Sequence, residues 1–223
     1  MSDLLSLDQA PAGLGAALRN AGFEQFTAIQ QAVLEPTLAD RDLRISSQTG
    51  SGKTVALGLL LADTVAGASG GTSSHKAPKS RVATPVALLI APTRELAGQL
   101  GRELGWLYEP IGARVLVVTG GTSVMQERTG LQKRPHVVIG TPGRLLDHLR
   151  AGAMKLDQLE TIALDEADEM LDMNFEEELD GILGYAPAER RTHLVSATFP
   201  RDVMKLANRL QRDPISVQGT ALG

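Results

Sequence analysis

The chain has 223 residues, of which 43% are hydrophobic and 22% charged, and its formal net charge at pH 7 is −4. This balance predicts one large globular domain with a sizeable core and excludes an intrinsically disordered chain. The absence of Cys excludes disulfides and thiolate metal sites, and the acidic net charge excludes nucleic-acid binding through a broadly basic face.

The first ten residues contain Asp3 and Asp8 but no basic stretch before an apolar run, so they do not form a signal peptide. The apolar stretches are all far shorter than the ~20 residues that cross a bilayer. We therefore expect a cytoplasmic protein without membrane contact. Four scattered histidines lack ligand-like spacing, so we expect structural roles for them and no structural metal. They are His75, His136, His148 and His193.

Two helices are predicted before the first strand, at 12–21 and 27–38, with Gly22 closing the first and Thr27 capping the second. From residue 43 onward, short apolar runs alternate with longer segments of helical period. The predicted strands are 43–46, 86–91, 114–119, 136–139, 160–164, 193–196 and 215–217. The predicted helices are 53–66, 94–108, 123–131, 143–151, 166–185 (broken near Asn174) and 201–211.

This alternation predicts an α/β fold, a doubly wound and mostly parallel sheet with helices on both faces. Ligands of such folds bind at the carboxyl ends of the strands. Residues 67–85 are rich in Gly, Ser, Thr, Lys and Pro and have no apolar period. They are predicted to form a mobile surface loop, and a solvated excursion is favoured over a binding role.

A glycine-rich segment between the first predicted strand and the next helix is the strongest local signal. It reads Gln48-Thr49-Gly50-Ser51-Gly52-Lys53-Thr54. Its glycines allow consecutive backbone N–H groups to point inward at an anion, and the helix N-terminus adds its dipole. We expect Lys53 to reach the β- and γ-phosphates of a nucleotide and the Thr54 hydroxyl to bind Mg²⁺. The alternative is a glycine-rich turn without a ligand.

Two acidic residues, Asp165 and Glu166, follow the predicted buried strand at 160–164. A phosphate-binding loop requires an acid for its metal at the end of another strand, so Asp165 is expected to bind Mg²⁺ through water. Glu166 is expected to orient or deprotonate the water that attacks the γ-phosphate. The alternative is simple complementation of the helix dipole by an acidic pair.

Asp165-Glu166-Ala167-Asp168 spells the sequence that names the DEAD-box helicases, and other blocks follow in that family's order. They are Pro92-Thr93-Arg94-Glu95-Leu96-Ala97, Gly120-Gly121, Thr141-Pro142-Gly143-Arg144 and Ser196-Ala197-Thr198. Gly22-Phe23 with Thr27-Ala28-Ile29-Gln30 is similar to the family's Q motif. Over nearly its whole length the chain resembles the N-terminal RecA-like domain of a bacterial DEAD-box RNA helicase. That domain is a P-loop NTPase, and residues 1–40 correspond to its Q-motif region.

The resemblance implies how the nucleotide base is bound. Gln30 would form two hydrogen bonds with the adenine edge, Phe23 would stack on the base, and Thr27 would hold the loop near the phosphates. Three positions depart from the family pattern, since Phe26 replaces a proline, Leu5 an aromatic residue and Ser47 an alanine. Phe26 and Leu5 bear on adenine selectivity more than on phosphate binding.

The resemblance also implies contacts with the sugar-phosphate backbone of RNA, with little sequence preference. The contacting residues would be Pro92, Thr93, Arg94, Gly120, Gly121, Thr141, Pro142, Gly143 and Arg144. Backbone N–H and hydroxyl groups would make most contacts, and Arg94 or Arg144 would add charge. Thr141 and Pro142 also fit a plain helix start, which is the alternative interpretation. Asp168, Ser196 and Thr198 would couple nucleotide state to RNA binding.

The implied function is that of an ATP-dependent RNA helicase, which uses ATP and Mg²⁺ to remodel RNA duplexes. Family members carry a second RecA-like domain, and these 223 residues are expected to hold only the first. We expect the chain alone to bind nucleotide, to contact RNA weakly and not to unwind it. Two alternatives are a nucleotide-gated RNA-binding module without ATPase work of its own, and a P-loop ATPase that acts on DNA or on another protein.

Overall fold

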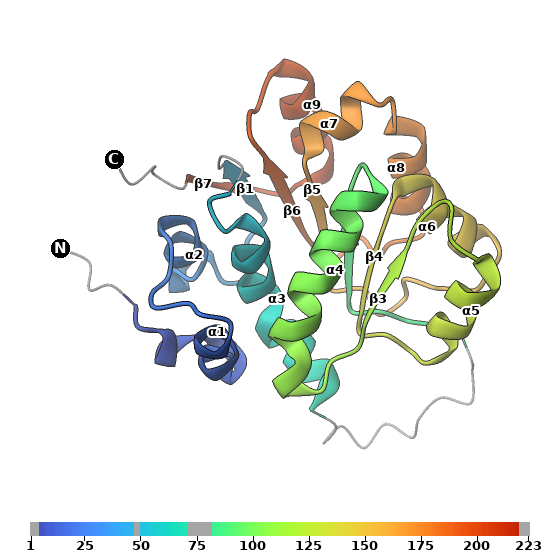
Figure 1. The fold of residues 1–223 in the computed structure, drawn as a ribbon. Coiled ribbons are helices and arrows are strands. Elements are labelled where there is room, and N and C mark those ends of the chain that lie inside the picture. Colours follow the sequence, from blue (N-terminus) through green and yellow to red (C-terminus); the bar gives the residue numbers. More distant parts are fainter. Residues whose placement is uncertain (1–4, 47–49, 71–81, 219–223) are drawn as a thin grey trace.

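The computed structural model describes residues 5–46, 50–70 and 82–218, which are built around one seven-stranded sheet (Figure 1). The spatial order is β3-β4-β2-β5-β6-β1-β7, and all pairings between these described strands are parallel. The bounds are β1 Leu43–Ser46, β2 Ala87–Ile90, β3 Val115–Val118, β4 Val137–Gly140, β5 Thr161–Asp165, β6 Arg191–Ser196 and β7 Ile215–Gln218. The predicted fold class is confirmed, and so are all seven predicted strands.

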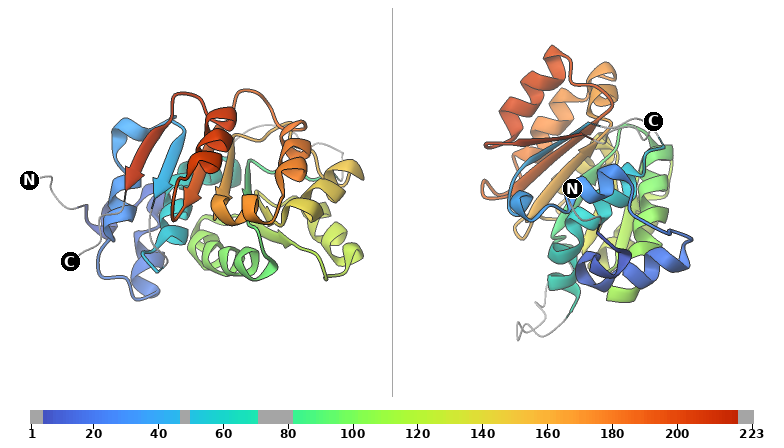
Figure 2. Two further views of the ribbon diagram at one scale, coloured as in Figure 1. Left: turned by 90° about the horizontal axis from the view of Figure 1, so that it is seen from above. Right: turned by 90° about the vertical axis from the view of Figure 1, so that its left-hand side faces the viewer.

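Helices cover both faces of the sheet, as predicted (Figure 2). They are α1 Gly15–Asn20, α2 Ala28–Val33, α3 Lys53–Ser69, α4 Arg94–Tyr108, α5 Val124–Gln132, α6 Pro142–Arg150, α7 Ala167–Asp172, α8 Glu176–Leu183 and α9 Arg201–Leu210. Helices α1 to α4 share one core with Leu89 of β2, whereas residues of α5 to α9 share the other core with Leu88 and Ile90. Strand β2 is therefore buried on both faces, which explains its continuous apolar run.

The region before β1 is more broken than predicted. The helix predicted at 12–21 starts only at Gly15, because Ala12 lies in a 3₁₀ turn with a φ of 51°. The helix predicted at 27–38 ends at Val33, and Pro36–Leu38 forms a separate 3₁₀ turn. Pro36 causes this break, since it lacks an N–H and disfavours helical backbone in the residue before it.

Two other predicted boundaries have different outcomes. The break near Asn174 is confirmed, because this residue has a φ of 59° and lies between α7 and α8. The loop predicted at 67–85 is wrong at both ends. Helix α3 continues through Gly67 to Ser69, since one glycine weakens a helix by only about 1 kcal/mol. At the other end Ala83 is buried and forms a parallel bridge with Met154. Residues 71–81 of this loop lie outside the described residues.

The sheet topology gathers the predicted functional segments at one edge. Strands β5, β6 and β1 are neighbours, so the segments that follow them start side by side. Strands β2, β4 and β3 are likewise neighbours and lead into the segments at 92–94, 141–144 and 120–121. None of the described helices is both long and apolar enough to cross a membrane.

Candidate functional site

The glycine-rich loop leads from β1 into α3. Gly50 and Gly52 have φ angles of 80° and 86°, which side chains with a Cβ rarely adopt, and Gly52 is the N-cap of α3. Lys53 is the first residue of that helix, so the positive end of the helix dipole lies beside its ammonium group. Gln48 and Thr49, predicted to bind phosphate, lie outside the described residues together with Ser47.

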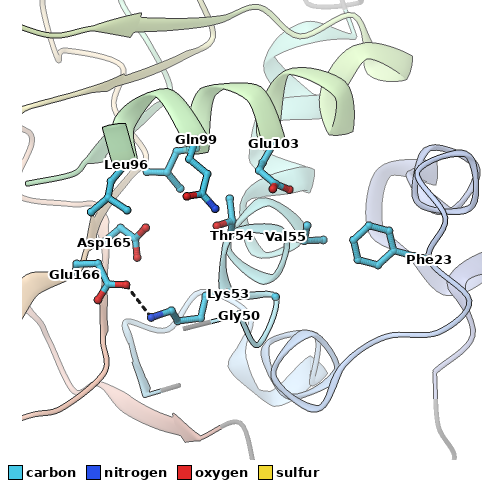
Figure 3. Close-up of a pocket in the computed structure, with 12 residues that line it drawn as sticks. Phe23, Gly50, Lys53, Thr54, Val55, Leu96, Gln99, Glu103, Asp165 and Glu166 are labelled. Carbon is cyan, nitrogen blue, oxygen red and sulfur yellow. Dashed lines mark hydrogen bonds and ion pairs between the residues drawn. The ribbon is translucent and has the colours of Figure 1, made fainter. Parts of the chain in front are cut away.

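Lys53 and Glu166 form an ion pair across the site (Figure 3). The Lys53 Nζ atom lies 2.9 Å from Glu166 Oε1, and the two side chains are only 9% and 16% exposed. Glu166 is the N-cap of α7 and has a left-handed backbone with a φ of 55°. A non-glycine residue in this conformation is strained, and such strain concentrates at functional sites. The strained backbone directs the Glu166 carboxylate toward the glycine-rich loop.

Asp165 ends β5 in the same pocket, and its side chain is buried. Burial raises the pKa of Asp165 to about 6, and the Glu166 charge adds to this effect, while Lys53 opposes it. The described residues hold no group of three or more His, Asp or Glu side chains suited to a metal. A buried carboxylate that lines the same cavity as Thr54 nevertheless fits Mg²⁺, because nucleotide-bound Mg²⁺ takes few protein ligands and completes its shell with phosphate and water.

The Q-motif residues contact the glycine-rich loop. Gln30 is fully buried, its Oε1 accepts the Thr27 N–H at 3.0 Å, and its Nε2 donates to the Gly52 carbonyl at 3.3 Å. Thr27 and Gln30 form a capping box at the start of α2, and the Thr27 hydroxyl lies against Gly52, where an added Cβ would come within 3.3 Å of it. Both polar side chains that were predicted to serve the nucleotide therefore adjoin the loop expected to bind its phosphates.

A cavity of about 320 Å³ runs from this loop toward Phe23. Phe23 stands at its far end in Figure 3, and its ring lies 6.1 Å from that of Trp106 at an angle of 33°. Gln99 and Glu103 of α4 also line the cavity, and both were missed in the sequence. Their spacing of four residues places them on one face of a helix that starts just after Thr93, which is the signal that could have identified them.

The residues predicted to contact RNA lie on loops and in the first turns of α4 and α6, at the other half of the same edge. The Thr93 hydroxyl caps α4 by accepting the Leu96 N–H at 3.3 Å. Arg94 is 60% exposed, and its guanidinium lies so close to Gly121 that a Cβ at that glycine would come within 2.3 Å of Nη1. Two of the predicted RNA-contacting blocks therefore touch each other.

In the segment that begins α6, one of the residues predicted to contact RNA already has a partner within the protein. Pro142 is the first residue of α6, as expected of a helix start, but the Thr141 hydroxyl makes no capping bond with any described residue. The Arg144 side chain is only 13% exposed, because its Nη1 lies 2.6 Å from Glu127 Oε2. No local pattern predicts this partner, and Arg94 is the more accessible of the two arginines predicted to add charge.

The three residues predicted to couple nucleotide and RNA binding also lie together. Thr198 Oγ1 donates to Asp168 Oδ2 at 3.4 Å, and Ser196 Oγ donates to the Thr198 carbonyl at 2.6 Å.

The histidines have partners in the fold: His136 Nδ1 accepts the Arg114 N–H, and His193 Nδ1 accepts the Leu43 N–H. His148 contacts Glu127, and His75 lies outside the described residues.

The chain is similar to known proteins along most of its length. A family model described as DEAD/DEAH box helicase matches residues 27–206. The chain is 38% identical to the ATP-dependent RNA helicase DbpA of Escherichia coli, across 98% of this chain and 45% of that protein. It is 41% identical to the ATP-dependent RNA helicase CshA of Listeria monocytogenes, across 89% of this chain and 36% of that protein. The chain thus spans less than half the length of these two curated relatives.

Two solved structures share the fold. A DEAD box protein from the hyperthermophile Methanococcus jannaschii superposes with a TM-score of 0.81 and 31% identity, covering 95% of this chain and 55% of that one. The RNA-helicase Prp28 from Chaetomium thermophilum, bound to ADP, superposes with a TM-score of 0.80 and 33% identity, covering 94% and 48%.

Proposed function

The chain belongs to the DEAD/DEAH box helicase family, and on that premise we propose that it is the ATP-binding lobe of an ATP-dependent RNA helicase. One observation carries the proposal. The Lys53–Glu166 ion pair lies beside buried Asp165 in a cavity at the carboxyl ends of β1 and β5. In this arrangement Lys53 would bind phosphate, Asp165 would bind the metal ion, and Glu166 would orient the attacking water.

Nucleotide binding would exchange the partners within this group. Phosphate oxygens would replace Glu166 as the acceptor for the Lys53 ammonium, and the backbone N–H groups of residues 48–52 would surround the phosphates. Thr54 and Asp165 would hold Mg²⁺, whose charge stabilises the negative charge that develops on the transferred phosphoryl group. Glu166, once released from Lys53, would orient the attacking water and accept its proton.

The adenine side would require a similar exchange. The Gln30 carboxamide now bonds with Thr27 and Gly52, so reading the adenine edge would require it to release the Gly52 carbonyl. Phe23 at the end of the cavity would stack on the base. Gly52 would then link base recognition to the shape of the phosphate loop, because it belongs to that loop and contacts Gln30.

RNA would bind across the neighbouring loops through its sugar-phosphate backbone. The proposed contacts are Pro92, Thr93, Arg94, Gly120, Gly121, Thr141, Pro142, Gly143 and Arg144. The hydrogen bond between Thr198 and Asp168 would couple this surface to the nucleotide, because Asp168 follows the metal-binding Asp165 by three residues. We further propose that the protein acts in the cytoplasm.

Efficient turnover and unwinding would require a second RecA-like domain, which adds cationic groups to the γ-phosphate. Such arginine residues contribute about 10³–10⁵-fold in rate in related phosphoryl-transfer enzymes. Residues 1–223 alone would therefore bind nucleotide and RNA, but they would turn over ATP slowly and leave RNA duplexes intact.

The test is a calorimetric titration of ADP and of GDP with Mg²⁺ into the chain and into Gln30→Ala. We expect ADP to bind more tightly than GDP and the variant to lose about five- to tenfold in ADP affinity, equivalent to one or two hydrogen bonds. Gln132→Ala, an exposed glutamine on α5, is the matched control and should behave as the unchanged chain. Equal binding of ADP and GDP by both chains would remove adenine recognition, and no nucleotide binding at all would overturn the proposed function.

A further inference from the structure

A buried carboxylate outside every recognised motif bridges two of the predicted RNA-contacting segments. Glu127 of α5 is 5% exposed. Its Oε1 accepts the Thr119 N–H at 2.8 Å and also the Thr122 hydroxyl. Its Oε2 lies 2.6 Å from Arg144 Nη1 and 2.7 Å from His148 Nε2. Each oxygen therefore bonds with a different part of the chain.

The two parts are the loop after β3 and the first turns of α6. Thr119 and Thr122 flank Gly120 and Gly121, whereas Arg144 and His148 follow directly after the Thr141-Pro142-Gly143 segment. Strands β3 and β4 are neighbours in the sheet, so both segments leave it at the same edge. The Arg144 Nη1 also lies 3.4 Å from the Thr122 carbonyl, which adds a direct bond between the two parts.

The carboxylate is charged and fully engaged. Burial raises the pKa of Glu127, but hydrogen bonds from Thr122, His148, Arg144 and Thr119 together outweigh burial and bring the pKa below its usual value. A buried ion pair of this kind is no more stabilising than well-packed apolar residues of the same volume. Its particular advantage is geometric, because four directed bonds fix the distance and orientation of the two segments.

Resting on the proposed RNA contacts, we propose that Glu127 is a positioning residue for RNA binding: it holds the Gly120-Gly121 loop and the start of α6 at the separation that successive phosphates require. A flexible loop must be ordered when a ligand binds, and this ordering lowers the affinity. Glu127 orders both segments before RNA arrives. It need not touch RNA, since its oxygens already have four partners within the fold.

The opposite interpretation is that Glu127 merely neutralises Arg144. The two interpretations predict opposite effects when the charge is removed. If Glu127 positions the loops, RNA affinity falls when its bonds to α6 are lost. If Glu127 only neutralises the Arg144 charge, removing the carboxylate leaves Arg144 free to bind RNA phosphates. RNA binding would then become stronger and more dependent on salt.

The test compares Glu127→Gln with the unchanged chain in binding a fluorescein-labelled uridine decamer, followed by anisotropy, and in binding ADP, followed by calorimetry. Glutamine keeps the shape and can still accept from Thr119, but its amide group opposes the Arg144 donor. We expect RNA affinity to fall about five- to tenfold, with ADP affinity unchanged, because only the RNA-facing segments lose their order. The matched control is Glu109→Gln, an exposed glutamate at the far end of α4, which should leave both affinities unchanged.

The outcomes separate this inference from the proposed function. Unchanged RNA affinity in Glu127→Gln, even with a lower melting temperature, would make the residue merely structural and overturn the inference alone. Higher RNA affinity with a steeper salt dependence would also overturn it. If Glu127→Gln does not fold, Thr122→Val decides, since it removes one bond to Oε1, and it should weaken RNA binding about twofold to threefold. No RNA binding by the unchanged chain would overturn both proposals.

Discussion

Asp165 and Glu127 are two buried carboxylates at the same edge of the sheet, and their surroundings are opposite. Burial raises the pKa of each. At Asp165 burial prevails, with help from the Glu166 charge, and the pKa rises to about 6. At Glu127 burial is outweighed by hydrogen bonds from Thr122, His148, Arg144 and Thr119, and the pKa falls.

The surroundings of a buried carboxylate separate one that is proposed to receive a ligand, such as Asp165, from one that maintains the structure, such as Glu127. Asp165 lies in a cavity and is energetically unfavourable as an anion, so a cation that binds there gains from relieving this state. Both carboxylate oxygens of Glu127 already bond with groups of the protein, and a further ligand would have to displace these bonds. Both residues are buried acids, and only the partners distinguish them.

Glu127→Ala should have the largest effect on stability. It removes the carboxylate partner of buried His148 and of the largely buried Arg144, together with the acceptor of the Thr119 N–H, so we expect the free energy of unfolding to fall by about 3–5 kcal/mol. Urea denaturation followed by circular dichroism measures this change, with Glu109→Ala as the exposed control. A loss below about 1 kcal/mol would contradict the view that Glu127 is a structural acceptor.

Lys53→Ala should have the next largest effect, and it acts on binding. Removing the ammonium deletes a charge-assisted bond to phosphate, so we expect the affinity for ADP with Mg²⁺ to fall about ten- to a hundredfold. Calorimetry measures it, and Lys205→Ala serves as control because Lys205 is 79% exposed on α9. Equal affinities in Lys53→Ala and Lys205→Ala would mean that the Lys53–Glu166 pair is structural.

Asp165→Asn should have the smallest effect of the three variants, and it should raise the free energy of unfolding where Glu127→Ala lowers it. The raised pKa means that ionisation of Asp165 disfavours the folded chain, so the folded state binds more protons than the unfolded state between pH 3.8 and about 6. The free energy of unfolding of the unchanged chain should therefore fall as the pH rises through this window. Asp165→Asn removes this contribution and should be more stable by about 1–2 kcal/mol at pH 7 without Mg²⁺.

Urea titrations of both chains at several pH values measure the difference, which should vanish below pH 3.8, where the unfolded carboxyl is also protonated. A constant difference across all pH values would show that Asp165 is not the titrating group. Lower stability of Asp165→Asn at pH 7 would place Asp165 in the same class as Glu127 and remove the contrast between them.

The fold could be predicted from the sequence, and the residues proposed to bind nucleotide could be identified from it, because both depend on local patterns. Apolar runs identify the strands, and the helix predicted at 94–108 from its helical period has the observed ends of α4, whose start the Thr93 hydroxyl caps. The N-terminal helices were predicted too long because Pro36 and the turn at Ala12 interrupt an otherwise helical pattern.

The Glu127 network could not be predicted in this way. Its members are up to 29 positions apart in the sequence, from Thr119 to His148, and meet only because β3 and β4 pair. Glu127 and His148 look like ordinary polar residues on amphipathic helices, and nothing local shows that they face each other. Gln99 and Glu103 were missed for a related reason, since the face of α4 that lines the cavity depends on how the helix packs.

Trp106 is the single tryptophan of the chain, and its ring lies beside that of Phe23, at the end of the cavity proposed to bind nucleotide. The chain thus carries an intrinsic fluorophore next to the group proposed to stack on adenine. Its emission reports on this corner alone, since no other indole contributes a background. Nucleotide binding can therefore be followed in the unmodified protein by excitation of Trp106, and a phosphate-only ligand such as pyrophosphate separates effects on the base pocket from effects on the loop.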